Sequence, residues 1–273
     1  TWGDNAYGQL GQGDGATVTN STTPLRVTLP RGAVAVAATN VASYALLDDG
    51  SVVAWGSNLG FGLLGNGSDA GTQRTPAAVK TAAGTDLTDV VQLAARDNDA
   101  VVLRRDGSVL TWGSFPADPA AFDPGNVTQP YVGGRTRATA INGLPAGVGI
   151  RKVLTEQGLF AALADDGAVY SWGVHFDMTA RGSFEPTTDG MLRDIDAVRV
   201  LNLPPVRDLM PGGFIGYGQR TTDRLTAMAI SYRGYLWKVR GRVAELYDAD
   251  RPTLQRRPVG SARSDCQSCH VVL

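Results

Sequence analysis

Residues 101–113 read Val-Val-Leu-Arg-Arg-Asp-Gly-Ser-Val-Leu-Thr-Trp-Gly. Two apolar runs flank the Asp-Gly pair, which favours the tight turn of a β-hairpin because glycine accepts a positive φ at no steric cost. In the matching stretch at 52–55, side chains alternate as they do on a strand with two different faces. The segment therefore predicts an antiparallel hairpin whose second strand ends at Trp112 and Gly113.

The same hairpin phrase recurs along the chain, which is typical of a repeat architecture. Two further copies end at Trp55 and Trp172, and the chain begins with the last residues of another copy, which ends at Trp2 and Gly3. A worn copy, in which the pattern is only partly kept, has Val239 in the tryptophan position. The markers lie about 59 residues apart, so the 273 residues hold four to five units. The signature residues of these units are Trp2, Gly3, Gly50, Trp55, Gly56, Gly107, Trp112, Gly113, Gly167, Trp172 and Gly173.

The composition agrees with short strands joined by many turns. Glycine makes up 34 of 273 residues, about 12% against a usual level of about 7%. A four-stranded sheet cannot bury both faces alone, whereas sheets packed radially as blades bury each other. We therefore predict an all-β fold, a β-propeller over residues 1–260 with four to five blade equivalents. Small residues such as Ala35 and Ala37 suit the strands nearest its centre.

Net charge and hydropathy exclude several partners. The chain carries 25 basic and 26 acidic residues, a net charge of −1, so no overall field attracts nucleic acid or an anionic membrane. No run of 18 apolar residues is present, so no membrane span is predicted. The segment 233–263 is basic; a solvated surface is the simplest interpretation, and docking of an acidic partner or nucleic acid is the alternative.

No set of residues with catalytic spacing is present. The glycine-rich phrases lack the Lys-Ser/Thr of a phosphate loop, and no Gly-x-Ser-x-Gly accompanies the two histidines, His175 and His270. The acidic pair Asp48 and Asp49 occupies a repeated hairpin turn, which indicates turn chemistry rather than glycosidase carboxylates. The run 97–99 does not fit a Ca²⁺ loop. We expect neither a catalytic nor a metal site, and hence no enzyme.

A second phrase follows the first two Trp-Gly pairs. It reads Asp-Asn-Ala-Tyr-Gly-Gln-Leu-Gly-Gln-Gly at 4–13 and Ser-Asn-Leu-Gly-Phe-Gly-Leu-Leu-Gly-Asn-Gly at 57–67, and a Thr-Pro pair follows each, at Thr23 and Thr75. With this order of phrases the chain resembles the repeats of the regulator of chromosome condensation family. The resemblance implies a β-propeller, usually of seven blades, and nucleotide-exchange activity toward a protein.

The two ends of the chain fall inside repeats. We therefore expect a piece of a longer chain and of a larger propeller; the alternative is that the Trp-Gly strand at the N-terminus completes the last blade of a small ring. The third and fourth copies carry insertions at 114–134 and 174–196 in place of the second phrase. Because loops on a rigid scaffold are where binding varies, we predict a binding or scaffold module that recognises a protein or other macromolecular partner there.

Both cysteines lie in one motif, Cys266-Gln-Ser-Cys269-His270. Two thiols three residues apart can each add to a haem vinyl group, and the next histidine can ligate the iron, as in c-type haem attachment. The alternative is structural, because 270–273 aligns with 100–103 and 261–273 then begins a further blade. Haem would make the chain an extracytoplasmic electron-transfer protein, whereas the strand needs no cofactor.

Overall fold

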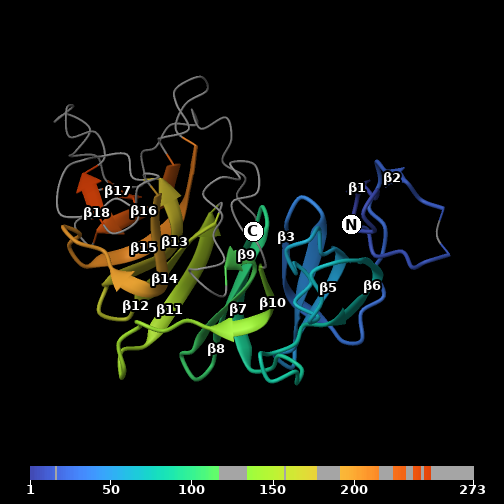
Figure 1. Cartoon of the computed structure of the whole chain (residues 1–273), viewed down its shortest axis with the longest axis horizontal. Helices are drawn as coiled ribbons and strands as arrows, with labels where there is room; N and C mark the ends of the chain where they lie inside the picture. Colours follow the sequence, from blue (N-terminus) through green and yellow to red (C-terminus); the bar gives the residue numbers. More distant parts are fainter. Residues whose placement is uncertain are drawn as a thin grey trace.

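The computed structural model describes residues 1–15, 17–116, 134–156, 158–176, 191–214, 224–231, 236–240 and 243–246. These residues form antiparallel sheets, and the described part contains no helix. Four sheets have four strands each and a fifth has two. Figure 1 shows the sheets following one another around an arc, as blades of a β-propeller do.

The strands of each blade are hydrogen-bonded in chain order, so each blade is an up-and-down meander. The first blade contains β3 (Ala33–Ala38), β4 (Ala42–Leu47), β5 (Val52–Ser57) and β6 (Thr72–Ala78). The second contains β7 (Val90–Arg96), β8 (Asp99–Arg104), β9 (Val109–Pro116) and β10 (Gly134–Ala140). The third contains β11 (Ile150–Glu156), β12 (Leu159–Ala164), β13 (Val169–Phe176) and β14 (Met191–Arg199). The fourth contains β15 (Val206–Phe214), β16 (Arg224–Ser231), β17 (Leu236–Arg240) and β18 (Val243–Leu246), and a two-stranded sheet of β1 (Gly3–Asp4) and β2 (Asn20–Ser21) precedes them all.

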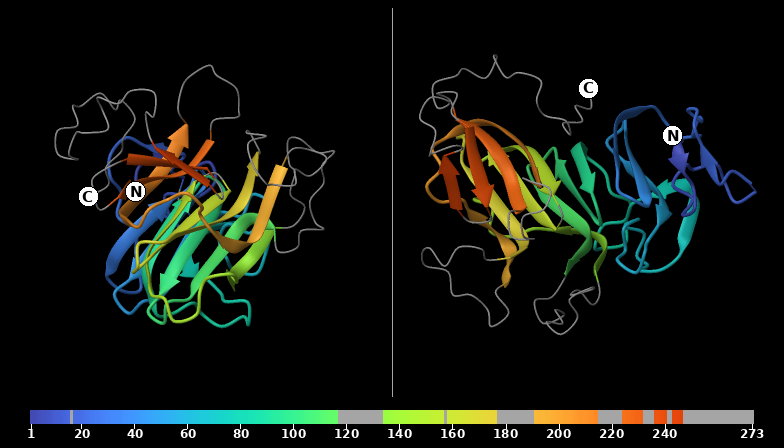
Figure 2. Two further views of the ribbon diagram at one scale, coloured as in Figure 1. Left: turned by 90° about the vertical axis from the view of Figure 1, so that its left-hand side faces the viewer. Right: turned by 90° about the horizontal axis from the view of Figure 1, so that it is seen from above.

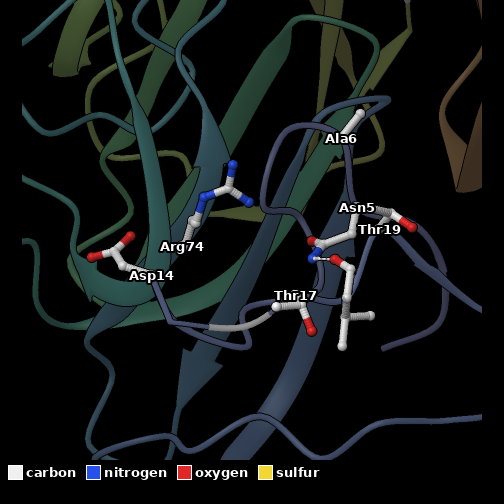
Figure 3. A pocket seen from close by; sticks show the side chains of 7 residues that line it. Asn5, Ala6, Asp14, Thr17, Thr19 and Arg74 are labelled. Carbon is white, nitrogen blue, oxygen red and sulfur yellow. Dashed lines mark hydrogen bonds between the residues drawn. The ribbon is translucent and has the colours of Figure 1, made fainter.

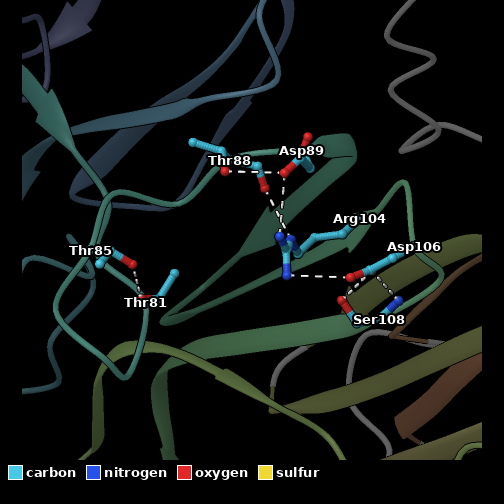
Figure 4. A network of polar contacts seen from close by, with 7 residues as sticks. All are labelled: Thr81, Thr85, Thr88, Asp89, Arg104, Asp106 and Ser108. Carbon is cyan, nitrogen blue, oxygen red and sulfur yellow. Dashed lines mark hydrogen bonds and ion pairs between the residues drawn. The ribbon is translucent and has the colours of Figure 1, made fainter.

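The Asp-Gly phrase forms the turn between the second and third strands, as the sequence predicts. Gly107 has a φ of +85°, and the carboxylate of Asp106 accepts hydrogen bonds from the backbone N–H and the hydroxyl of Ser108, at 2.9 and 2.6 Å. These bonds, led by the one from the hydroxyl, lower the pKa of Asp106. Figure 4 shows this turn beside Arg104, which also contacts Asp89 at 3.4 Å. The acidic residues here are therefore parts of the turn.

The blades are held together face to face by apolar clusters. The first strands contact one another, β3 with β7, β7 with β11 and β11 with β15, so they are the inner strands (Figure 2). Tyr44 and Trp112 are buried between the first and second blades, and Phe160 and Trp172 between the second and third. The worn copy folds as a fourth blade, in which Val239 is fully buried against the third. The tryptophan position thus fills the space between blades.

The glycine after each tryptophan allows a close crossing of strands. Gly113 has a φ of +112°, and a Cβ placed there would lie 2.9 Å from the Cα of Asp99 and closer still to the carbonyl of Asn98. The second strand begins at this crossing. Gly56 and Gly173 stand in the same arrangement in their own blades.

Candidate functional site

The glycine-rich corners bind the blade that follows. The indole Nε1 of Trp55 donates to the carbonyl of Gln9, and that of Trp112 donates to the carbonyl of Leu63, both at 2.9 Å. The hydroxyl of Tyr44 donates to the same Leu63 carbonyl at 2.7 Å, and its complete burial raises the pKa of the phenol. Each corner therefore acts as a clasp between neighbouring blades. We call the stretches 4–13 and 57–67 the first and second corners.

A buried asparagine shapes each corner. The Asn5 amide accepts a hydrogen bond from the backbone N–H of Leu10 at 2.9 Å, and the Asn58 amide accepts one from Leu64 at 2.8 Å. Asn58 also donates to the carbonyl of Ala70 at 3.0 Å, which ties the corner to the loop that leads to β6. The Asn of the second phrase is therefore a structural residue. The second and third blades have Phe115 and His175 at this position, in line with their loss of the phrase.

The tryptophan of the third blade has no carbonyl acceptor for its indole N–H in the described part of the chain. Trp172 is fully buried, and its Nε1 has no hydrogen-bond partner there. Instead its ring stacks on Phe160, with centroids 5.5 Å apart and planes 2° apart. The preceding insertion at 114–134 replaces the corner, and residues 117–133 lie outside the described residues.

The two insertions begin and end at the same edge of the propeller. One joins β9 to β10 and the other joins β13 to β14, so each connects a third strand to a fourth. The turns from the first to the second strand, at 97–98 and at Gly158, lie at this edge too, because the second strand starts opposite the end of the third. We call this edge the loop end.

Two carboxylates at the loop end are buried. Arg96 lies 3.0 Å from Glu156, an ion pair that joins the second and third blades and in which the carboxylate is almost fully buried. Asp99, 1% exposed, accepts a hydrogen bond from the hydroxyl of Ser114 at 3.0 Å. The sequence singles out Asp99 only as a poor cation candidate, and nothing in it marks Glu156.

The root of the first insertion is also buried. Arg135 is the second residue of β10 and is buried; its guanidinium donates to the hydroxyl of Thr111 at 2.9 Å. Burial lowers the pKa of Arg135 to about 10, while Asp196 of the third blade opposes that shift. The insertion therefore joins two strands that are paired with each other, β9 and β10.

The residues considered for metal binding, acid–base chemistry and haem attachment lie in different parts of the chain. Within the described ranges no three His, Cys, Asp or Glu side chains are placed to hold a metal ion. Asp48 forms an ion pair with Arg31 at 2.7 Å, and His175 lies in β13 opposite Leu192. Residues Cys266, Cys269 and His270 lie outside the described residues, so the haem hypothesis stays a prediction, as does the basic segment beyond 246.

A small polar cavity lies beside the first corner (Figure 3). It measures about 300 Å³ and carries one basic and one acidic side chain, Arg74 and Asp14. Its remaining lining residues are Asn5, Ala6, Thr17, Val18 and Thr19. The cavity lies between the corner and β6, apart from the charged pairs of the loop end.

Comparison with known proteins agrees with this geometry. The model of the regulator of chromosome condensation (RCC1) repeat matches residues 1–46. Prp20p from Saccharomyces cerevisiae has a similar structure, with a TM-score of 0.59 at 19% identity over 81% of this chain and 49% of that one. The same yeast protein bound to Kap60 gives a TM-score of 0.57 at 18% identity, over 81% and 47%.

Human WBSCR16 is also similar, with a TM-score of 0.61 at 16% identity over 89% of this chain and 60% of that one. The chain thus spans between about half and three fifths of the length of these proteins. The repeat at its start and the blades that follow confirm the resemblance to the RCC1 repeat proteins and the all-β propeller fold. In the part of the chain that the structure describes, no helix is long and apolar enough to cross a membrane.

Proposed function

We propose that the chain is a non-enzymatic module that binds a protein partner through the loop end. The observation that carries the proposal is the common origin of the two insertions, which both leave the propeller at that edge. A rigid scaffold that presents variable loops on one side is the usual basis of recognition in such folds. The ion pair of Arg96 and Glu156 joins the second and third blades at this edge.

The similar proteins supply the choice of first partner. Prp20p is described for its binding to Gsp1p and to histones, and the structure with Kap60 describes a further protein complex. These are properties of the yeast protein, and this chain spans about half of its length. We propose that this chain binds a protein of the same kinds.

The test is a binding titration of the full chain against purified Gsp1p and histones, with biolayer interferometry as the readout. In one variant, residues 117–133 are replaced by a Gly-Ser linker of equal length. A control variant replaces 82–86, which join the fourth strand of the first blade to the next blade at the opposite edge.

We expect the first variant to lose at least about tenfold in affinity, about 1.4 kcal/mol, and the control to bind like the unaltered chain. Binding that is lost equally in both variants, or unchanged in both, would remove the loop end from the proposal. Binding of neither probe by the unaltered chain would overturn the choice of partner class.

A further inference from the structure

The two corners dock on the fourth strand of the following blade in the same way. The backbone N–H of Gly13 donates to the carbonyl of Arg74 in β6 at 3.0 Å, and that of Gly67 donates to the carbonyl of Thr136 in β10 at 2.8 Å. The φ values of the two glycines, +91° and +93°, agree as well. Arg74 therefore occupies the position of Thr136, so docking of a corner does not require a charged side chain there.

The loop that follows the first corner is longer than the one that follows the second. After Gly13, four residues precede Val18, whose carbonyl accepts a hydrogen bond from the corner asparagine at 2.6 Å. After Gly67, only two residues precede Ala70, which accepts the corresponding bond at 3.0 Å. The hydroxyl of Ser68 closes the shorter loop, because it donates to the carbonyl of Ala70 at 2.9 Å and accepts from its N–H at 3.3 Å. The longer loop instead lines the polar cavity of about 300 Å³ beside β6.

Two opposite charges line this cavity without pairing with each other. Arg74 belongs to β6 and Asp14 to the longer loop (Figure 3). Among the residues that the structure describes, neither side chain has a partner in an ion pair or a hydrogen bond. The stem of Arg74 crosses Gly8 closely, since a Cβ at that glycine would lie 2.8 Å from the Cγ of the arginine. The guanidinium donors and the carboxylate are therefore both available to a molecule in the cavity.

We propose that this cavity binds a small zwitterion of the amino-acid class, with its carboxylate on Arg74 and its ammonium on Asp14. A simple anion would be attracted by the guanidinium but repelled by the carboxylate, and a simple cation the reverse. A ligand with both charges gains two charge-assisted hydrogen bonds, and the hydroxyls of Thr17 and Thr19 add neutral donors and acceptors. At about 30 Å³ per water, the cavity has the volume of about ten water molecules, which accommodates an amino acid.

This site is separate from the surface proposed for the protein partner. Its lining residues come from the first corner, from the loop that leads to β2 and from β6. The two insertions leave the second and third blades instead. Binding of a zwitterion and binding of a protein can therefore be measured independently, and failure of one proposal leaves the other standing.

A series of ligands with increasing charge separation tests the proposal in the full chain. Glycine, γ-aminobutyrate and ε-aminocaproate are titrated and followed by NMR, with butyrate and butylamine as controls that carry one charge each. We expect at least one of the zwitterions to bind with a dissociation constant of about 1 mM or lower, at least about tenfold tighter than both controls, and to shift the Nε–H resonance of Arg74. Equal affinity for either control, or no binding of any of the zwitterions, would overturn the proposal.

Variants of the two charges identify the site. Arg74→Gln and Asp14→Asn each remove one charge, and each should weaken binding of the best zwitterion at least about tenfold. The matched controls are Arg137→Gln and Asp69→Asn, which change exposed charges beside the second corner and should leave binding unaltered. Deletion of residues 15–16 gives the loop the length that it has after the second corner, and should abolish binding while the circular dichroism spectrum is kept. Binding that survives the deletion or either charge change, or that falls equally in the controls, would overturn the proposal.

Discussion

Replacing Gly113 by alanine should destabilise the propeller by several kcal/mol. The φ of +112° is one that side chains rarely adopt, which costs about 1–3 kcal/mol. The new methyl would lie 2.9 Å from the Cα of Asp99 and closer to the carbonyl of Asn98, both backbone atoms that cannot rotate away. Overpacking of this kind costs a further 1–3 kcal/mol, so we expect a total of about 4 kcal/mol.

The matched control for that change is Gly107→Ala. Gly107 also has a positive φ, but nothing lies within 4 Å of the position of its Cβ, so only the conformational cost of about 1–2 kcal/mol applies. Both variants are unfolded in urea and followed by far-UV circular dichroism, and the difference between their free energies of unfolding isolates the steric part. Equal destabilisation of the two variants would refute the idea that the strand crossing requires this glycine.

Three other outcomes are expected. Trp112→Phe removes the indole donor to the carbonyl of Leu63 and should lower the free energy of unfolding by about 1 kcal/mol more than Trp172→Phe, whose indole N–H has no partner in the described residues; urea midpoints compare them. Ser108→Ala should raise the pKa of Asp106 toward its ordinary value, as measured by NMR titration. Because the folded-state pKa of that carboxyl is lowered, its contribution to stability is present above the unfolded pKa and fades as the pH falls through the folded one, so the variant should lose less stability in acid. The purified chain, expressed in cells able to attach c-type haem, should show no haem α band, and a haem spectrum would contradict the strand interpretation.

Local chemistry explains why the blades could be predicted from the sequence. The Asp-Gly turn and the following Trp-Gly pair each depend on residues a few positions apart, so the copies that end at Trp55, Trp112 and Trp172 all display them. The worn copy around Val239 was recognisable for the same reason, since its alternating apolar run survives the loss of the tryptophan. That phrase predicts four to five units and places the second and third strands of each blade.

The contacts between blades could not be predicted in the same way. The corner phrase and the tryptophan both stand out in the sequence, but the acceptor of Trp55 lies 46 residues earlier, in the corner of the preceding repeat. The buried carboxylate of Asp99 is also invisible, because the equivalent positions hold Ala42 and Leu159. Such side chains acquire a role only when two blades meet.

The clasp formed by each corner also bears on how chains of this kind grow and shrink. The tryptophan that donates this hydrogen bond and the corner carbonyl that accepts it are spaced by one repeat. Duplication of one repeat therefore adds one donor and one acceptor, whichever residue the duplicated segment begins at. An added repeat can therefore form this hydrogen bond with both of its neighbours. Deletion of exactly one repeat brings a donor and an acceptor of the remaining blades together again. Loss of a single corner, as before the third blade, weakens only one junction, because each blade contacts only its neighbours. A propeller built this way can exchange a corner for a longer insertion one junction at a time.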